Sequence, residues 1–173
     1  MTCFVLMTHA RGLDNSGKSS CVRAFLNESL DGLAPTLGFE IRSAQVGEHR
    51  LHLWDVGGQK SIRPFWRNYF EDTDGLVWVV DSGDVDRLQL CREQLSRVIE
   101  EERLVGASIV ILANKQDLEG ALTAEEISVI LGLDQLLKRR FKVIPCSAVS
   151  GEGVKEGFEW IVGEIASRLF VLD

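Results

Sequence analysis

Apolar runs of strand length alternate along the chain with stretches whose apolar residues recur every three to four positions. Two of the runs, residues 76–80 and 109–113, are apolar at every position, which is typical of parallel strands covered on both faces. The expected strands span residues 3–10, 39–46, 51–56, 75–81, 108–113 and 142–146. This alternation predicts an α/β fold, with a six-stranded, mostly parallel sheet and helices on both faces.

Four stretches have the helical spacing of apolar residues, namely residues 18–28, 86–102, 123–131 and 154–169. Thr123 and Glu126 open the third stretch as a capping box, in which each side chain satisfies a free backbone amide. Gly47 and Glu48 predict a tight turn, so the strands on either side of them are expected to pair in antiparallel fashion. The chain has no repeat, linker or low-complexity tract, and we expect one domain over residues 1–173.

Residues 12–19 read GLDNSGKS and fit the phosphate-binding pattern G-x-x-x-x-G-K-[ST], directly before the first expected helix. Two glycines let the backbone approach a ligand, and the loop amides point at phosphate oxygens at a helix N-terminus. Lys18 is expected to reach the β- and γ-phosphates, and the Ser19 hydroxyl to bind Mg²⁺. The expected phosphate-binding residues here are Gly12, Asp14, Asn15, Ser16, Gly17, Lys18, Ser19 and Ser20. The alternative is a glycine turn before a helix, with an exposed lysine.

Two further segments supply groups for the metal and the γ-phosphate. Asp55 ends a strand, where it can hold Mg²⁺ through a water molecule, and the Gly58 amide can meet the γ-phosphate. Gln59 follows at the place for an amide that orients the attacking water. Thr36 can complete the Mg²⁺ shell with its hydroxyl while its amide meets the γ-phosphate. Taken singly, these segments are also compatible with a glycine loop after a strand and with an ordinary Pro-Thr turn.

A guanine site is predicted by the polar residues that follow the last two expected strands. The Asp117 carboxylate can accept hydrogen bonds from N1–H and from the exocyclic amino group of guanine, whereas adenine offers neither donor there. Asn114 can contact N7, and the Lys115 stem can lie over the ring. Backbone amides at Ser147 and Ala148 can donate to O6. The segment disfavours an ATPase or a nucleotide kinase, for which we find neither a lid nor an acceptor site.

Composition narrows the class of protein further. The chain has 173 residues and a formal charge of −7, which excludes a nucleic-acid partner because the phosphate backbone requires a basic face. Its four cysteines show no C-x-x-C pairing and no zinc spacing, so we expect reduced thiols. No apolar run approaches the ~20 residues of a membrane span. Position 2 is Thr, which excludes N-terminal myristoylation, so we expect a cytoplasmic protein without a direct membrane anchor.

The motifs occur in the order and spacing of a Ras-like small GTPase, and the chain resembles the ARF and ARF-like family over residues 12–170. The resemblance rests on GLDNSGKS, PTLGF, WDVGGQKSIRPFWRNYF, VVDS, NKQDL and CSA, and above all on DVGGQ, where other small GTPases usually have DTAGQ. Within the family the type-two ARF-like branch is most similar, through WRNYFEDTDGLVWVVDS, EEERLVGA, ANKQDLEGAL and CSAVSGEG. The type-three branch is the alternative.

The resemblance implies a GTP/GDP switch with an Mg²⁺ cofactor, whose GTP form binds effectors through the switch regions. Exchange factors and GTPase-activating proteins would set the lifetime of that form, and the hairpin of residues 41–55 would slide along the sheet on GTP loading. Phe39, Trp54 and Tyr69 match family aromatic positions around it. The type-two branch further implies a tubulin folding cofactor or a carrier of lipidated cargo as partner, and a location at microtubules or centrosome-like structures.

Catalysis is expected to consist of positioning and electrostatics, with Lys18 stabilising charge and Gln59 aligning the water. The motifs contain no evident arginine finger, so intrinsic turnover should be slow, on the order of 10⁻³ s⁻¹ or below. Arg63 and Arg67 are interpreted as effector or structural contacts. A scaffold that holds nucleotide without useful turnover is the alternative function, and the presence of both Gln59 and Thr36 favours the switch.

The N-terminus departs from the family pattern. Only eleven residues precede Gly12, so the amphipathic helix usual in the family is expected to be absent. Thr8, His9, Ala10 and Arg11 stand where an apolar strand should run into the loop, and burying an unpaired guanidinium would cost several kcal/mol. Three interpretations follow: Arg11 leaves the strand end, the strand slips in register, or the segment stems from a mis-joined exon.

Overall fold

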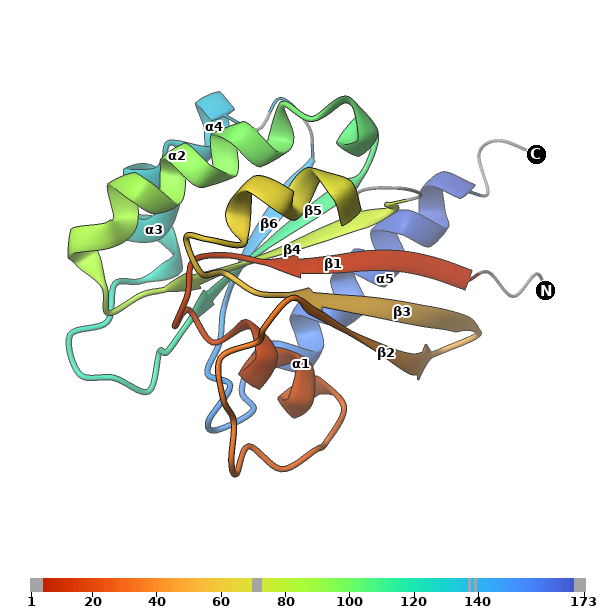
Figure 1. The fold of residues 1–173 in the computed structure, drawn as a ribbon, viewed down its shortest axis with the longest axis horizontal. Coiled ribbons are helices and arrows are strands. Elements are labelled where there is room, and N and C mark those ends of the chain that lie inside the picture. The colour runs from red at the N-terminus through yellow and green to blue at the C-terminus, as the bar shows by residue number, and fades with distance from the viewer. Residues whose placement is uncertain (1–4, 70–72, 137, 139, 170–173) are drawn as a thin grey trace.

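The computed structural model describes residues 5–69, 73–136, 138 and 140–169. Six strands form one sheet (Figure 1). In spatial order they are β2 (Phe39–Val46), β3 (His49–Val56), β1 (Val5–Arg11), β4 (Gly75–Asp81), β5 (Ser108–Asn114) and β6 (Phe141–Pro145). All neighbouring pairs are parallel except β2 and β3. The predicted fold class is therefore confirmed.

The strand pattern follows from burial. Every residue of β5 is buried, and so is every residue of β4 except its last, as the continuous apolar runs predict for strands covered on both faces. The hairpin between β2 and β3 turns at Gly47, whose φ of 57° lies in the left-handed region that favours glycine. Val46 and His49 pair across this turn, so the predicted antiparallel hairpin is confirmed.

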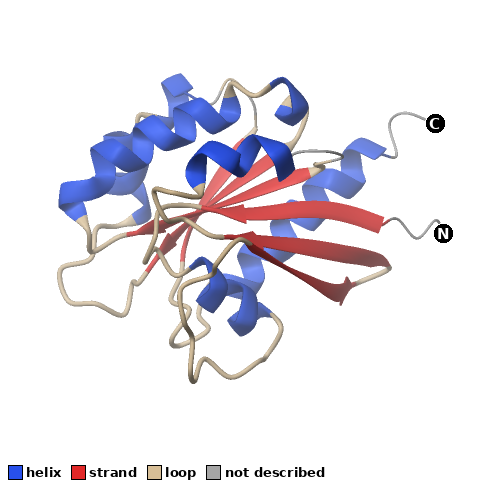
Figure 2. Ribbon diagram, in the orientation of Figure 1, coloured by secondary structure: helices blue, strands red, loops and turns tan. Residues whose placement is uncertain are grey.

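Helices cover both faces of the sheet (Figure 2). On one face, α1 and α5 pack over β1, β3, β4 and β5, and on the other α2, α3 and η1 enclose a second core. The helical elements are α1 (Lys18–Phe25), η1 (Arg63–Tyr69), η2 (Val85–Arg87), α2 (Leu88–Ile99), η3 (Glu102–Leu104), α3 (Ala124–Leu131), α4 (Leu133–Leu136) and α5 (Val154–Leu169).

Helix ends differ from the sequence prediction where a residue leaves helical geometry. The first helix ends at Phe25 and not at residue 28, because Asn27 adopts a left-handed φ of 55° and closes the turn. The second ends at Ile99, because Glu101 is extended and turns the chain so that Leu104 becomes buried. The predicted capping box of Thr123 and Glu126 is present, with both of its hydrogen bonds.

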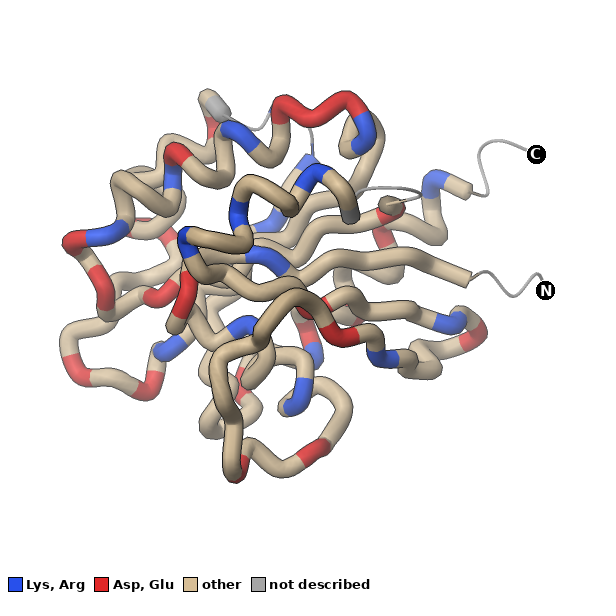
Figure 3. The backbone as a smooth tube through the Cα atoms, in the orientation of Figure 1, with Lys and Arg blue, Asp and Glu red and all other residues tan. Residues whose placement is uncertain are grey.

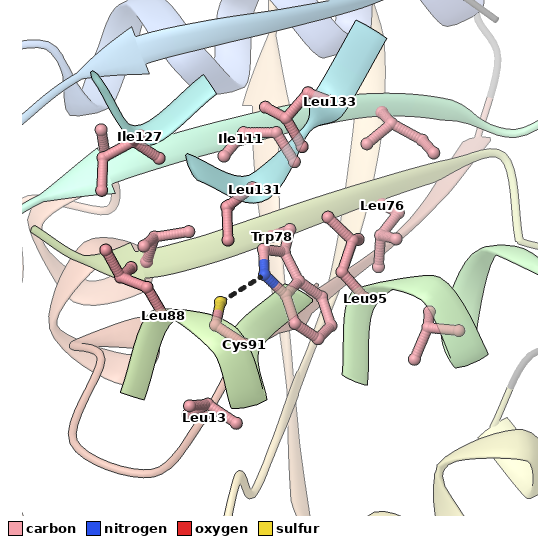
Figure 4. Packing of buried hydrophobic residues seen from close by; sticks show 14 of the residues in the cluster. Leu13, Leu76, Trp78, Leu88, Cys91, Leu95, Ile111, Ile127, Leu131 and Leu133 are labelled. Carbon is pink, nitrogen blue, oxygen red and sulfur yellow. Dashed lines mark hydrogen bonds between the residues drawn. The ribbon is translucent and has the colours of Figure 1, made fainter. Parts of the chain in front are cut away.

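The core between the sheet, α2 and α3 is centred on Trp78, which is fully buried (Figure 4). Its indole Nε1–H donates to Cys91 Sγ at 3.3 Å, so the one polar atom of this large side chain has a partner inside the core. Cys21, Cys91 and Cys146 are buried free thiols, as expected. Cys3 lies outside the described residues.

Strand β1 carries the polar stretch before the phosphate loop through the middle of the sheet. Its register is regular, with Thr8 opposite Leu53 and Arg11 opposite Trp78, so the interpretation of a register slip is wrong. Arg11 is fully buried, so the expectation that it leaves the strand is wrong as well. Its Nη2 lies 3.3 Å from His9 Nδ1 and 3.5 Å from the Trp66 carbonyl oxygen. Its guanidinium carbon lies 5.7 Å from the centroid of the Trp66 ring, where a cation–π contact stabilises the charge.

Burial of His9 predicts a loss of stability in acid. Burial, and next the charge of Arg11, lower the pKa of His9 from 6.5 to about 3 in the folded protein. Above pH 6.5 neither state binds the proton, whereas below it only the unfolded chain does. Each pH unit below 6.5 should then cost about 1.4 kcal/mol, or about 2 kcal/mol by pH 5.

The measurement is chemical unfolding at pH 6.5 and pH 5 of the unchanged protein and of His9→Leu, which removes the titrating group. We expect the unfolding free energy of His9→Leu to fall by about 2 kcal/mol less across this interval. Equal losses in the two proteins would show that His9 is not buried in its neutral form.

The carboxyl ends of the five parallel strands meet at one edge of the sheet. Each strand is followed by a residue of one of the sequence motifs. These are the phosphate loop after β1, Gly57 after β3, Ser82 after β4, the NKQD segment after β5 and Cys146 after β6. In open α/β sheets ligands bind at this edge. Among the described residues, no helix has both the length and the apolar character needed to cross a membrane.

Candidate nucleotide-binding site

The phosphate loop joins β1 to α1 in the conformation that its glycines allow. Gly12 has a φ of 146°, and a Cβ there would lie 2.3 Å from the Val79 carbonyl oxygen. Gly17 has a φ of 90°, and a Cβ there would lie 2.3 Å from Asn114 Nδ2. Asn15 also adopts a positive φ, of 60°. Only glycine fits the first two positions, so the spacing of the motif is a steric requirement of this fold.

Lys18 provides a buried positive charge beneath the loop. It is 6% exposed, and its Nζ donates to the Leu13 carbonyl oxygen at 2.8 Å. Burial lowers the pKa of Lys18 to about 8, and the charges of Asp55 and Asp14 oppose that shift. A buried ammonium group whose pKa is lowered in this way gains from a nearby anion, and a phosphate group is one.

Ser19, Thr36 and Asp55 come together although they lie in three separate segments. Ser19 Oγ and Thr36 Oγ1 are 2.9 Å apart. Asp55 is almost fully buried, and its Oδ1 accepts no hydrogen bond within the described part of the chain. Burial raises the pKa of Asp55, and the Ser19 hydroxyl and the charge of Lys18 partly offset the effect. Three oxygen-bearing groups, one of them with an unsatisfied buried oxygen, are thus available to a cation.

A pocket of 330 Å³ opens beside these groups. The loops after β1 and β3 and the segment before β2 form its wall. Its lining includes nine of the predicted site residues: Asp14, Asn15, Gly17, Lys18, Ser19, Ser20, Thr36, Gly58 and Gln59. Gly58 packs directly on the phosphate loop, since a Cβ there would lie 2.6 Å from Asp14 N. Most of the residues predicted to bind the phosphates and the metal therefore line one cavity.

The predicted base-binding residues form a second group at the same sheet edge. Ser147 Oγ donates to Asp117 Oδ1 at 2.6 Å, which orients an exposed carboxylate. Lys115 adopts a positive φ of 68°, and its Nζ forms an ion pair with Asp81 Oδ2 at 2.6 Å. The strained backbone and the ion pair hold the lysine in one place.

Asn114 ties the two groups together. It is 1% exposed, its Nδ2 donates to the Ser16 carbonyl oxygen at 2.9 Å, and its Oδ1 accepts from the Ala148 amide at 3.0 Å. The side chain predicted to contact N7 thus joins the phosphate loop to both base-binding segments. The sequence prediction named the residue without this connection.

Arg87 was missed as part of the site, and Arg63 was interpreted as an effector or structural contact without a named partner. Arg63, at the start of η1, forms an ion pair with Asp14 Oδ1 at 2.8 Å, and Arg87 forms one with Asp14 Oδ2 at 3.1 Å. Basic positions lie along η1 (Figure 3), but no local sequence pattern says which of them turns toward the loop. Of the aromatic residues matched to the family, Phe39 stacks on Trp54 with their ring centroids 5.0 Å apart. The side chain of Tyr69 lies outside the described part of the chain.

Comparison with known proteins agrees with this geometry. Residues 5–165 match the model of the ADP-ribosylation factor family. The chain is 53% identical to ADP-ribosylation factor-like protein 2 of Arabidopsis thaliana over 163 residues, covering 94% of the chain and 88% of the relative. It is 49% identical over 162 residues to the protein of that name in Drosophila melanogaster, with the same coverage.

A solved structure shares the fold. The Arl6 BBS3 small GTPase of Trypanosoma brucei, with the bound nucleotide analogue GppNp, superposes with a TM-score of 0.87 at 29% identity. The alignment covers 94% of this chain and 98% of that one. Sequence, fold and the convergence of the motifs agree: the chain belongs to the ADP-ribosylation factor family and is an ARF-like small GTPase, a switch that binds GTP and GDP and hydrolyses GTP.

Proposed function

We propose that this GTPase is Mg²⁺-dependent and that its switching uses the residues that converge on the phosphate pocket. The observation that carries this proposal is that Lys18, Ser19, Thr36 and Gln59 line one cavity, although they come from three separate segments of the chain. In this proposal Lys18 and the loop amides hold the phosphates, Asp117 holds guanine, and Asn114 keeps the two subsites in register.

The residues fit a magnesium ion. Mg²⁺ holds oxygen ligands at about 2.0–2.1 Å in an octahedron, so neighbouring ligands lie about 2.9 Å apart. Ser19 Oγ and Thr36 Oγ1 share a hydrogen bond at 2.9 Å, so the two hydroxyls already lie as close together as neighbouring ligands of such an ion would. Asp55, with its unsatisfied buried Oδ1, supplies a carboxylate for a metal-bound water. When bound, the ion would neutralise charge on the β- and γ-phosphates.

Hydrolysis in this proposal depends on placing groups and not on covalent chemistry. Gln59 lines the phosphate pocket, where its amide can orient a water molecule toward the γ-phosphate. Lys18 keeps its charge close to the transferred group because its carbonyl contact anchors the ammonium. Without an arginine that reaches the pocket from a partner, turnover should stay slow.

Effectors and regulators would bind beside the phosphate pocket. Four large apolar side chains are exposed close in sequence to Thr36 and Gln59, namely Leu37 (84%), Phe39 (41%), Ile41 (50%) and Phe65 (55%). Exposed apolar groups near a ligand-sensing loop favour a partner that distinguishes the GTP form. A tubulin folding cofactor or a lipidated-cargo carrier as that partner, and a microtubule location, rest on the family resemblance alone.

Ser19→Asn tests the metal role. The longer amide cannot occupy the position 2.9 Å from Thr36 without displacing it, so the shared metal position is lost. We expect GTP affinity to fall by about tenfold or more relative to GDP affinity, because the γ-phosphate depends more on the ion. The measurement is competition of both nucleotides against a fluorescent GDP analogue, with and without Mg²⁺.

Ser167→Asn on α5 is the matched control, since Ser167 is exposed and is not among the residues that line the pocket. It should keep the affinity ratio of the unchanged protein. A Ser19→Asn protein with an unaltered ratio of GTP to GDP affinity would refute the metal role of Ser19.

A further inference from the structure

The carboxylate of Asp14 lies between two guanidinium groups. Arg63 Nη2 contacts its Oδ1 at 2.8 Å, and Arg87 Nη1 contacts its Oδ2 at 3.1 Å. Arg87 also donates from Nη2 to the Asp14 carbonyl oxygen at 3.3 Å and pairs with Asp84. Asp14 lines the phosphate pocket, so the two cations hold its negative charge in a fixed direction beside the place proposed for phosphate.

Arg63 makes a second contact that Arg87 does not make. Its Nε donates to the carbonyl oxygen of Gly58 at 2.8 Å while its Nη2 holds Asp14. The Arg63 side chain is only 10% exposed, whereas the Asp14 side chain is 43% exposed, so the guanidinium group is largely buried while the carboxylate still faces the pocket. One rigid guanidinium group thus joins the phosphate loop to the glycine whose amide is proposed to meet the γ-phosphate.

The charges around Asp14 support a persistent arrangement. The two carboxylates and two guanidinium groups of Asp14, Asp84, Arg63 and Arg87 form a neutral cluster. Burial would raise the pKa of Asp14, but the charge and hydrogen bond of Arg87, together with the charge of Arg63, lower it. The carboxylate therefore stays ionised near neutral pH and keeps both arginines.

We propose that Arg63 is a positioning residue that selects GTP over GDP: it holds Gly58 and Gln59 against the phosphate loop through Asp14. This inference deepens the proposed function and rests on it. GDP has no γ-phosphate, so its binding does not depend on where Gly58 lies. Loss of Arg63 should therefore weaken GTP binding selectively, and hydrolysis should fall with it because Gln59 follows Gly58 directly.

The experiment compares three variants of the full chain. Arg63→Gln removes the charge and the fork of donors, whereas Arg63→Lys keeps the charge but cannot bond Asp14 and Gly58 in the same way. Arg67→Gln, on the same helical element η1, is the matched control for loss of one positive charge there. For each protein the dissociation constants of GDP and of a non-hydrolysable GTP analogue are measured with Mg²⁺ present.

For Arg63→Gln we expect an increase of about tenfold in the GTP-analogue dissociation constant and an unchanged GDP constant. The GTP-analogue dissociation constant of Arg63→Lys should lie between those of Arg63→Gln and the unchanged protein. That of Arg67→Gln should equal the value of the unchanged protein. In a double-mutant cycle, combining Asp14→Asn with Arg63→Gln should lower the binding free energy of the GTP analogue by less than the sum of the two single changes, since both changes break the same contact.

An equal loss of GDP and GTP affinity would mark Arg63 as merely structural and overturn the inference. So would an Arg63→Gln protein with the affinity ratio of Arg67→Gln. If the unchanged protein bound no guanine nucleotide at all, the proposed function would fail and the inference with it. If the unchanged protein bound both nucleotides and Arg63→Gln had the same ratio of GTP-analogue to GDP affinity, only the inference about Arg63 would be overturned.

Discussion

Replacing Asp117 with asparagine is expected to lower the affinity for GTP by about 100-fold, since two charge-assisted hydrogen bonds are lost. Asparagine also turns an NH₂ donor toward the amino group of guanine, where the carboxylate had offered an acceptor. Ser147 holds Asp117 Oδ1 at 2.6 Å, so the side chain at this position has a defined direction. Xanthosine triphosphate carries a carbonyl oxygen in place of that amino group, and the variant should bind it better than GTP.

The measurement is competition of GTP, ATP and xanthosine triphosphate against a fluorescent guanine nucleotide, for the unchanged protein and for Asp117→Asn. Glu119→Gln makes the same carboxylate-to-amide change on an exposed neighbour and should leave every affinity unchanged. If GTP affinity survived in Asp117→Asn, the base would be held elsewhere, and the proposed guanine subsite would be wrong.

Gln59→Leu should keep GTP binding and slow hydrolysis by about 100-fold. Gln59 borders the phosphate pocket, and leucine fills a similar volume without a group that can orient water. The contacts proposed to hold the phosphates come from Lys18 and from loop amides, which the substitution leaves in place. Binding and turnover should therefore separate, with the loss confined to turnover.

Single-turnover release of phosphate from preloaded GTP measures this step apart from nucleotide exchange. Gln89→Leu, an exposed position on α2, is the control for the same chemical change and should hydrolyse GTP at the unchanged rate. Undiminished turnover in Gln59→Leu would remove Gln59 from its role and leave water orientation to another group.

Local sequence signals were sufficient for the fold and for most of the candidate site. Two strands, β2 and β4, and helix α5 have the predicted limits, because apolar periodicity and glycine turns are local properties of the chain. The nine predicted residues around the phosphate pocket lie together for a related reason. Except for the Thr36 segment, which precedes β2, each motif directly follows a strand or opens a helix, and parallel strands bring their carboxyl ends to one edge.

Sequence reasoning was wrong about the burial of a polar residue whose partners lie in distant segments of the chain. A guanidinium group in the centre of a sheet looked too costly to bury, yet Arg11 lies beside His9 and against the Trp66 ring. Trp66 belongs to η1, an element that the periodicity did not predict. A residue's partners, and therefore the cost of burying it, depend on segments more than fifty positions away.

The sequence alone determined the sheet, the order of the motifs and the side chains available for phosphate, metal and guanine. Only the tertiary structure decided that Asn114 joins the loop to both base-binding segments, and that Arg63 and not Arg67 reaches Asp14. The physical reason is that ion pairs and hydrogen bonds depend on distance in space and leave no periodic trace in the chain. Asp14 lies 49 residues from Arg63 and 73 from Arg87, and the folded sheet edge brings the three together.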